Sequence, residues 1–395
     1  MSRIVVTGIG VISAVGNTVD ANRTALVNGQ CGITPLRNID TRFAGLMPFG
    51  EIKTTTGTLK EQLHASEPGV TRTMLLSLHA FNEAVADSGL PASDISSLNT
   101  AFISGNTVGG MCLTDELYAD TRSTANGTEY MTSYDAASVG IYVQDRYRMN
   151  GITDTFNTAC SSSANAIMYG AKLIQHGFAK RAIVGGADTL AKFTINGFNA
   201  LRILSDDICR PFDKDRKGLN LGEGSAYIVL EKEADAAGKT IYAVLQGYGN
   251  ANDAYHPSSL SAEGDGPVAA MYAALSKANL SPGDIDFINA HGTATENNDE
   301  VESVAMKKVF GHVPAFASTK GYTGHTLGAA GAIEAVYSIL SLHNQELYPA
   351  LHFREAIAAT GLIPVQYYQK KHLQHVMSNS FGFGGNCTSL IFSKY

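Results

Sequence analysis

The amino-acid sequence predicts an α/β protein made of two related halves, and two observations carry the prediction. Short β-branched runs that end in Gly-rich turns alternate with longer segments whose apolar residues recur every three or four positions, a pattern typical of buried strands and helices. A strand, a tight turn and a helix are also expected twice, at 155–167 and at 316–331. This recurrence indicates an internally duplicated fold whose halves each contribute reactive groups.

The individual elements follow in order along the chain. The clearest strands, rich in Val, Ile and Ala, are expected at 4–10, 100–105, 181–186, 226–231, 241–247, 286–290 and 376–380. The clearest helices, recognised by their apolar periodicity, are expected at 71–88, 162–176, 266–278, 299–310 and 329–343. A short polar connection at 231–239 separates two strands, and it divides the chain into expected halves 1–235 and 236–395.

Composition narrows the class of protein. The 395 residues are 44% hydrophobic and 16% charged, as in ordinary globular proteins, and the net charge of −7 without a long basic run argues against a nucleic-acid partner. No apolar stretch reaches the roughly 20 residues of a membrane span. Five scattered cysteines without a Cys-x-x-Cys pair argue against a disulfide framework or a metal site. Because a strand pattern begins at once, no signal peptide is expected, and a cytoplasmic location is predicted.

Cys160 is the first candidate reactive residue. It lies in the segment 157–165, where a predicted strand turns into a helix of small residues. The unpaired N–H groups and the positive dipole at a helix start favour a thiolate over a thiol, and small neighbours allow a bulky substrate to approach. The alternative is an ordinary buried cysteine, and the local sequence leaves both interpretations open.

Two histidines lie in Gly-rich turns beside predicted elements. His291 directly follows the strand at 286–290, and His325 precedes the helix at 329–343. Loops at strand ends are where rigid scaffolds place reactive groups. Each histidine is therefore a candidate for catalysis, although most of the 11 histidines should be surface or hydrogen-bonded interior residues.

A lysine and a glutamate could support these groups. Lys320 lies five residues before His325, close enough for its ammonium to reach the same cavity. Glu334 falls among Ala, Ile and Val on the following helix, where a lone carboxylate is costly unless it is paired. The two residues could form a buried pair, while exposure to solvent is the alternative for each.

The segment 381–386, Phe-Gly-Phe-Gly-Gly-Asn, is a Gly-rich turn after a strand. It lacks the spacing of a dinucleotide-binding motif, and no phosphate-binding loop or metalloprotease motif occurs elsewhere. A backbone loop whose N–H groups approach a developing oxyanion, with Phe383 as an apolar gate, is the better interpretation.

Taken together and in this order, the motifs around Cys160, His291, Lys320 to His325 and Phe383 resemble those of the condensing enzymes of fatty-acid and polyketide synthesis. The similarity is to the β-ketoacyl-acyl-carrier-protein synthases of type I/II, and it runs nearly end to end. Segments 5–13, 210–218, 222–224 and 253–256 also carry it.

The resemblance implies a thiolase-like fold, in which two similar α/β halves form a five-layered α-β-α-β-α core, usually in a homodimer. It implies decarboxylative Claisen condensation, in which Cys160 takes the acyl chain from a carrier-protein thioester. His291 and His325 would help to decarboxylate malonyl-carrier protein and stabilise the enolate. No metal or redox cofactor is implied; the substrates arrive on the phosphopantetheine arm of acyl carrier protein.

Further roles are implied by position in the family's motifs. The backbone N–H groups of Cys160 and Phe383 match the oxyanion hole, and Lys320 and Glu334 match a buried supporting pair. The remaining matches are Thr293 and Thr295 for the phosphopantetheine arm, His256 and the Val108 region for the acyl pocket, and Arg72 and Arg202 for a basic patch that binds the acidic carrier protein.

The sequence departs from the family at two places and leaves two alternative functions. Segment 296–299 is polar where Pro or small apolar residues are usual, and Asn386-Cys387 replaces Thr-Asn or His-Asn. These departures concern acyl-chain preference and pathway, and they remove no catalytic group. A thiolase acting on coenzyme A thioesters would use a second reactive cysteine. A noncatalytic chain-length partner would lack Cys160. The sequence does not distinguish a homodimer from a heterodimer with a related chain, because both would use the same dimer surface.

Overall fold

The computed structural model describes residues 3–114, 117–118 and 130–395, which form one mixed sheet of ten strands between layers of helices. The strand order is β10-β9-β13-β14-β8-β1-β7-β6-β4-β5. The strands are β1 (Ile4–Ser13), β4 (Thr100–Gly105), β5 (Thr153–Phe156), β6 (Arg181–Asp188), β7 (Gly224–Lys232), β8 (Ala243–Asn252), β9 (Phe287–Asn289), β10 (Ala315–Ala317), β13 (His375–Phe381) and β14 (Asn386–Ser393).

The sheet consists of two sets of five strands with the same topology. The order β5-β4-β6-β7-β1 in the first set corresponds to β10-β9-β13-β14-β8 in the second. In each set the first two pairings are parallel and the last two antiparallel. The sets join only where Val5 and Val6 of β1 pair with Val244 and Ala243 of β8. The topology confirms the expected duplication.

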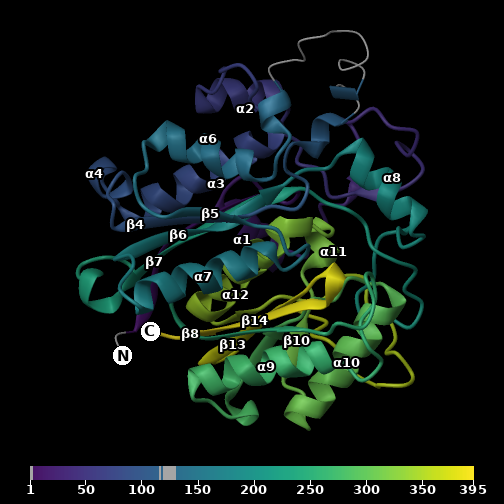
Figure 1. Cartoon of the computed structure of the whole chain (residues 1–395). Coiled ribbons are helices and arrows are strands. Elements are labelled where there is room, and N and C mark those ends of the chain that lie inside the picture. Colours follow the sequence, from purple (N-terminus) through teal and green to yellow (C-terminus); the bar gives the residue numbers. More distant parts are fainter. Residues whose placement is uncertain (1–2, 115–116, 119–129) are drawn as a thin grey trace.

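Two helices fill the space between the two strand sets. In Figure 1, α7 (Ser162–Gln175) and α12 (Ala330–Asn344) lie between β4–β7 on one side and β8, β13 and β14 on the other. Nearly every residue of α12 is buried, as expected for a helix covered on both faces. The two helices approach closely at Gly331, where a Cβ would lie only 2.8 Å from the Cβ of Ala164.

Further helices cover the outer faces. α3 (Arg72–Ser88) and α6 (Ala137–Tyr147) lie outside the first set, and α9 (Asp265–Ala278) and α10 (Glu296–Phe310) outside the second (Figure 1). The result is the five-layered α-β-α-β-α core of the thiolase-like fold. Among the described residues, no helix is both long and apolar enough to span a bilayer.

Short elements complete the chain. The helices are α1 (Val19–Val27), α2 (Thr56–Leu63), α4 (Ala92–Ile95), α8 (Lys192–Ala200) and α11 (Lys320–Thr323), and two small hairpins pair β2 (Thr34–Pro35) with β3 (Pro48–Phe49) and β11 (Glu346–Leu347) with β12 (Gln369–Lys370). The 3-10 turns are η1 (Gly109–Leu113), η2 (Met131–Ser133), η3 (Glu233–Asp235), η4 (Pro282–Asp284), η5 (Leu327–Ala329) and η6 (Phe383–Gly385).

The strands and helices expected from the sequence are all present, with small differences at their ends. The largest at a helix start is α10, which begins at Glu296, three residues earlier than the periodicity indicates. Its first turn is polar and carries no apolar pattern. β14 was not among the expected strands, although it pairs along its whole length with β13 and β8.

Candidate active site

A cavity of about 600 Å³ reaches from the surface to the boundary between the two halves. Its buried part is lined by Cys160, His291 and His325, three residues that are at most 6% exposed. The lining also includes Thr293, Thr295, Phe381 and Phe383, and, at the exposed end, Arg202, Lys217, Asn297 and Asn298. The predicted catalytic residues are therefore brought together.

Cys160 is placed by a tight turn between β5 and α7. Ala159 has a left-handed backbone (φ 53°), and Ser161 is the N-terminal capping residue of α7. The backbone N–H groups of Phe383 and of Cys160 itself point at the thiol sulfur. These are the two groups that the family resemblance assigns to an oxyanion hole.

The resting thiol is less acidic than its position at a helix start led us to expect. Burial raises the pKa of Cys160 to about 11, although the N–H of Phe383 and the charge of Lys320 act in the opposite direction. The expectation of a thiolate favoured by the helix is wrong for the free protein, because the surrounding protein removes water from the sulfur.

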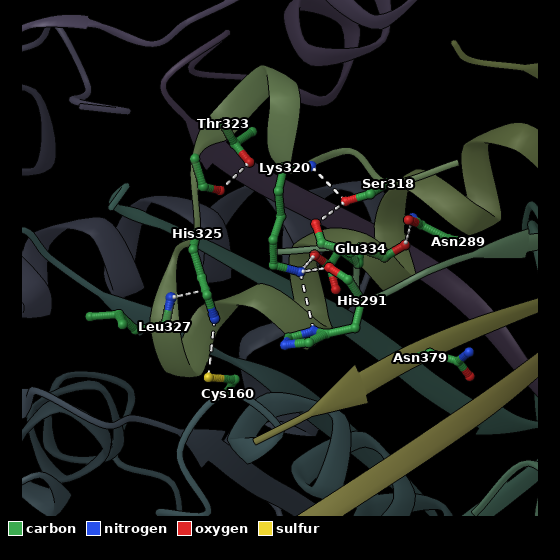
Figure 2. A network of polar contacts seen from close by, with 12 residues as sticks. Cys160, Asn289, His291, Ser318, Lys320, Thr323, His325, Leu327, Glu334 and Asn379 are labelled. Atoms are coloured by element: carbon green, nitrogen blue, oxygen red, sulfur yellow. Dashed lines mark hydrogen bonds and ion pairs between the residues drawn. The ribbon is translucent and has the colours of Figure 1, made fainter. Parts of the chain in front are cut away.

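His325 faces Cys160 from the equivalent turn of the second half. Gly324 (φ 70°) ends α11, and the imidazole that follows has its Nε2 atom 3.1 Å from the sulfur of Cys160 (Figure 2). The backbone N–H of Leu327 donates to Nδ1 at 3.1 Å, so the neutral ring carries its proton on Nε2. Burial and the charge of Lys320 lower the pKa of His325 well below its usual value.

His291 lies beside His325, with ring centres 5.4 Å apart and nearly perpendicular planes. Lys320 Nζ lies 3.2 Å from its Nδ1 atom and donates to it, which again leaves the ring proton on Nε2. Burial lowers the pKa of His291, and the charge of Lys320 lowers it further. The site therefore presents two neutral imidazoles, each with an Nε2–H donor.

Lys320 and Glu334 form the buried pair that the sequence suggested (Figure 2). Both side chains are at most 4% exposed, and Lys320 Nζ also donates to the carbonyl oxygen of His291 at 2.6 Å. Burial raises the pKa of Glu334 to about 7, while Lys320 opposes the shift. The lysine thus fixes both the backbone and the ring of His291.

Four other predicted residues line the same cavity. The hydroxyl oxygens of Thr293 and Thr295 are 2.8 Å apart. Phe383 stacks on Phe198 of α8, with ring centres 5.9 Å apart and planes 14° from parallel. Arg202, directly after α8, is exposed. All four residues lie on the cavity, and their arm-binding, gate and basic-patch roles stay predictions.

Three expected placements are not supported. Arg72 pairs with the fully buried Glu223 at 2.7 Å and donates to backbone carbonyls, so its side chain is structural and not part of an exposed basic patch. His256 is exposed, and the nearby Ser258 and Ser259 line the cavity in its place. Val108 is buried in an apolar cluster and does not line this cavity.

Two buried carboxylates that hold the site were not among the residues predicted from the sequence. Glu302 of α10 accepts the N–H groups of His291 and Gly292, both at 2.8 Å. Asp188, at the end of β6, accepts those of Thr107 at 2.9 Å and Gly328 at 2.7 Å. For Glu302, an acidic residue on the buried face of a predicted helix is the sequence feature that could have indicated a supporting role.

The three central residues could be considered for metal binding, since their ligating atoms lie within 4.8 Å of one another. The two imidazoles offer no free lone pair, however. In each ring Nδ1 accepts a hydrogen bond and Nε2 carries the proton. A metal ion could bind an imidazole only by displacing the Nε2 proton or the donor that is hydrogen-bonded to Nδ1.

Comparisons with known proteins agree with this geometry. The family model "Beta-ketoacyl synthase, N-terminal domain" matches residues 1–236, and "Beta-ketoacyl synthase, C-terminal domain" matches residues 242–354. The 3-oxoacyl-[acyl-carrier-protein] synthase 2 of Staphylococcus aureus (strain N315) is 33% identical over 414 residues, covering 100% of this chain and 98% of the relative.

Solved structures are similar over the whole chain. The ishigamide ketosynthase/chain length factor superposes with a TM-score of 0.93 at 31% identity, covering 100% of this chain and 99% of that one. A type II polyketide-synthase ketosynthase, bound to the hexaketide and in complex with its acyl-carrier protein, gives a TM-score of 0.89 at 26% identity and full coverage of both chains.

The fold and the site define a condensing acyltransferase, an enzyme that joins acyl groups through a cysteine thioester. The matches over both halves then identify the family. The chain belongs to the β-ketoacyl synthase family, the β-ketoacyl-acyl-carrier-protein synthases of the thiolase-like superfamily.

Proposed function

We propose that this chain extends an acyl chain by two carbons, with Cys160 as the nucleophile and His291 and His325 as the donors that stabilise the enolate. The observation that carries the proposal is the 3.1 Å contact between Cys160 Sγ and His325 Nε2 at the buried end of the cavity, with His291 beside it.

The first step is transfer of the acyl group from a thioester to Cys160. The sulfur attacks the thioester carbonyl, whose oxygen becomes negative and accepts the N–H groups of Cys160 and Phe383. The intermediate collapses with loss of the carrier's sulfur, and the proton of the Cys160 thiol ends on that departing sulfur. The step needs no side chain that keeps the thiol proton. This agrees with the low pKa values of His291 and His325, which make both imidazoles weak bases.

The second step is decarboxylation of a malonyl thioester and attack on the acyl-enzyme. Loss of CO₂ leaves an enolate, whose oxygen accepts the Nε2–H groups of His291 and His325. The enolate carbon attacks the acyl carbonyl, and the bond to Cys160 breaks. The released thiolate takes up one proton from water, and the product is a 3-oxoacyl thioester. No change of oxidation state requires a redox cofactor, and the proposal includes no metal.

The proposed carrier of both substrates is acyl carrier protein. Arg202 and Lys217 are exposed at the open end of the cavity, where they suit a phosphodiester and an acidic protein. Thr293 and Thr295 lie further in and could hydrogen-bond the amides of a phosphopantetheine arm. The solved complex of a similar ketosynthase with its acyl-carrier protein supports this proposal.

The proposed assembly is a homodimer through the free edge of β5. Within the described residues β5 pairs only with β4, and the exposed Ile141 and Ile152 lie on and beside the adjoining elements α6 and β5. An unpaired edge flanked by apolar side chains favours a second strand. Light scattering of the purified chain should give twice the chain mass. A monomer that dimerises only with a related chain, as the ketosynthase/chain length factor suggests, would replace this assembly.

A cytoplasmic location is part of the same proposal. No described cysteine forms a disulfide, and a carrier-protein pathway that depends on a reduced thiol suits a reducing compartment.

Intact-protein mass spectrometry tests the function. The protein is mixed with a series of acyl-carrier-protein thioesters and then with malonyl-carrier protein. We expect an acyl adduct that disappears as a product two carbons longer forms, no adduct with Cys160→Ala, and a normal adduct with Cys31→Ala. An adduct on Cys160→Ala would exclude Cys160 as nucleophile. No adduct with any thioester, coenzyme A thioesters included, would overturn the proposal in favour of a noncatalytic partner.

A further inference from the structure

The two N–H groups that point at the sulfur of Cys160 belong to different halves of the molecule. One is on Cys160, immediately before α7, and the other is on Phe383, in the loop between β13 and β14. They can act on one oxygen only if the two loops keep a fixed separation, because hydrogen bonds weaken steeply outside a narrow range of distance and angle. Some contact must therefore hold the loops together.

Asn386 makes that contact. Its backbone carbonyl accepts the N–H of Gly382 at 2.8 Å and so closes the loop that carries Phe383. Its side-chain Oδ1 accepts the hydroxyl of Ser161, the residue after Cys160, also at 2.8 Å. One residue is thus bonded to both loops.

Two further amides fix the side chain of Asn386. Asn165 of α7 donates to its Oδ1 at 2.8 Å, and Asn250 of β8 donates to the same oxygen at 2.9 Å. Thr388 links these two residues by a hydroxyl that donates to Asn165 and accepts from Asn250, each at 2.8 Å. An oxygen that accepts three hydrogen bonds in a connected network has one orientation.

The sequence at this point departs from the family, which usually has Thr or His where this chain has Asn386. A threonine side chain is one bond shorter and has no carbonyl oxygen, so it cannot accept three donors in the same way. A connection through a side-chain carbonyl, as Asn386 makes to Ser161, is therefore not available to a threonine at this position.

We propose that Asn386 is a positioning residue for acyl transfer: it sets the separation of the Cys160 and Phe383 N–H groups, and so the strength with which they bind the oxyanion. The inference rests on the proposed function of those two N–H groups. In this proposal Asn386 does not touch the substrate. It acts on the reacting atoms through its hydrogen bonds to Ser161 and Gly382.

Two reactions of the same thiol separate this role from a general structural one. Transfer of an acyl group passes through an oxyanion, whereas alkylation of Cys160 by iodoacetamide does not. For Asn386→Leu we expect acyl transfer from acyl-carrier protein to slow by about tenfold to a hundredfold, less than the roughly hundredfold to thousandfold loss for a removed oxyanion donor, because here the donor is displaced and not removed. The alkylation rate should fall much less, because in that reaction the Phe383 N–H acts only through the pKa of the thiol and binds no oxyanion. Both rates are read as adducts by intact-protein mass spectrometry at one pH.

Two companion variants keep the test decisive. Ser161→Ala removes the bond between Asn386 and the nucleophile turn, together with the contacts of the same hydroxyl to Thr158. It should lower the ratio of the two rates even if Asn386→Leu does not fold. Asn82→Leu, an asparagine on α3 whose side chain accepts from Tyr147, is the control and should leave the ratio unchanged. Equal slowing of both reactions in the variants of Asn386 and Ser161, or no slowing, would overturn the inference. Failure of the proposed function is distinct, because the wild-type protein would then form no acyl adduct.

Discussion

At the scale of single residues, the two histidines of the site are neutral hydrogen-bond donors. Nδ1 of each catalytic histidine is an acceptor, for Lys320 in His291 and for the Leu327 N–H in His325. Both rings are therefore fixed as Nε2–H donors, which suits an enolate or oxyanion better than a thiol proton. The arrangement explains why a lysine is buried beside a histidine.

The raised pKa of Cys160 predicts a specific pH dependence. Because the thiolate is the nucleophile and the pKa is about 11, the rate of alkylation by iodoacetamide should rise about tenfold per pH unit from pH 7 to 10 without levelling off. Mass spectrometry of the wild-type protein, with Cys160→Ser to identify the adduct, measures the rate. A plateau below pH 8 would contradict the prediction and indicate a stabilised thiolate.

Removal of the buried lysine charge should destabilise the protein. Lys320→Met leaves Glu334 buried without its partner, for which we expect a loss of about 3–5 kcal/mol in the free energy of unfolding at pH 8. The carboxyl has a raised pKa and becomes neutral as the pH falls, so the loss should be smaller at pH 5.5. Urea unfolding at both pH values gives the two losses.

The double variant Lys320→Met/Glu334→Gln is the control for this prediction. It replaces the carboxylate by a neutral amide of the same shape and should recover part of the stability at pH 8. Equal losses at the two pH values would show that lost packing, and not an unpaired charge, is responsible.

At the scale of elements, the loop after β13 has to lie directly on the nucleophile turn. A Cβ on Gly382 would be 2.7 Å from the carbonyl oxygen of Thr158 and 3.2 Å from the backbone nitrogen of Cys160. Glycine at this position is therefore required by close approach of two backbones.

Substitution of this glycine should affect acyl transfer more than stability. Gly382→Ala must push the loop away from Cys160, and we expect the rate of acyl transfer to fall by at least about tenfold, since one oxyanion donor is displaced. The rate is measured from acyl-carrier protein by mass spectrometry. Gly57→Ala, within α2, is the matched control and should leave the rate unchanged, because the added methyl would lie at an ordinary contact distance of 3.9 Å from Thr55 Oγ1. Normal transfer by Gly382→Ala would show that the loop adjusts without moving the Phe383 N–H.

Sequence patterns could predict elements and the reactive residues because both depend on local signals. Cys160 and His325 lie at helix starts, and Glu334 is a carboxylate within an apolar helix. The pKa of Cys160 could not be predicted in this way, since the loop around Phe383 is more than 200 positions away in the chain. For the same reason the pair of Arg72 with Glu223, formed across 151 positions, was not visible, and Arg72 was assigned to the surface.

At the scale of the whole molecule, α7 and α12 hold the two halves together. The Cβ of Ala164 faces Gly331 at the closest approach, and Ser163 Oγ accepts the backbone N–H of Ala332 at 2.9 Å. Each helix packs on strands of both sets. The halves therefore share one core, and neither has a complete apolar interior without the other.

This contact gives a test of the coupling between the halves. Gly331→Ala should lower the free energy of unfolding by about 1–3 kcal/mol, because the added methyl forces α7 and α12 apart. Ala164→Gly/Gly331→Ala moves the methyl from one helix to the other and should recover part of that loss. The effects of substitutions at residues in contact are generally not additive. Urea unfolding measures both. Independent, additive effects would show that the added methyl is opposed by the backbone nitrogen of Ala164, also 2.8 Å away, and not by the Ala164 methyl.

The matching order of the two strand sets has a consequence for the asymmetry of the centre. The same kind of turn begins α7 and α12, so the topology brings the residues at these two positions face to face. Two identical halves would present two identical side chains there. This chain presents a sulfur from one and an imidazole from the other. A scaffold with approximate twofold symmetry thus holds an asymmetric centre, which in the proposed condensation would keep the acyl group on the first half and stabilise the enolate from the second.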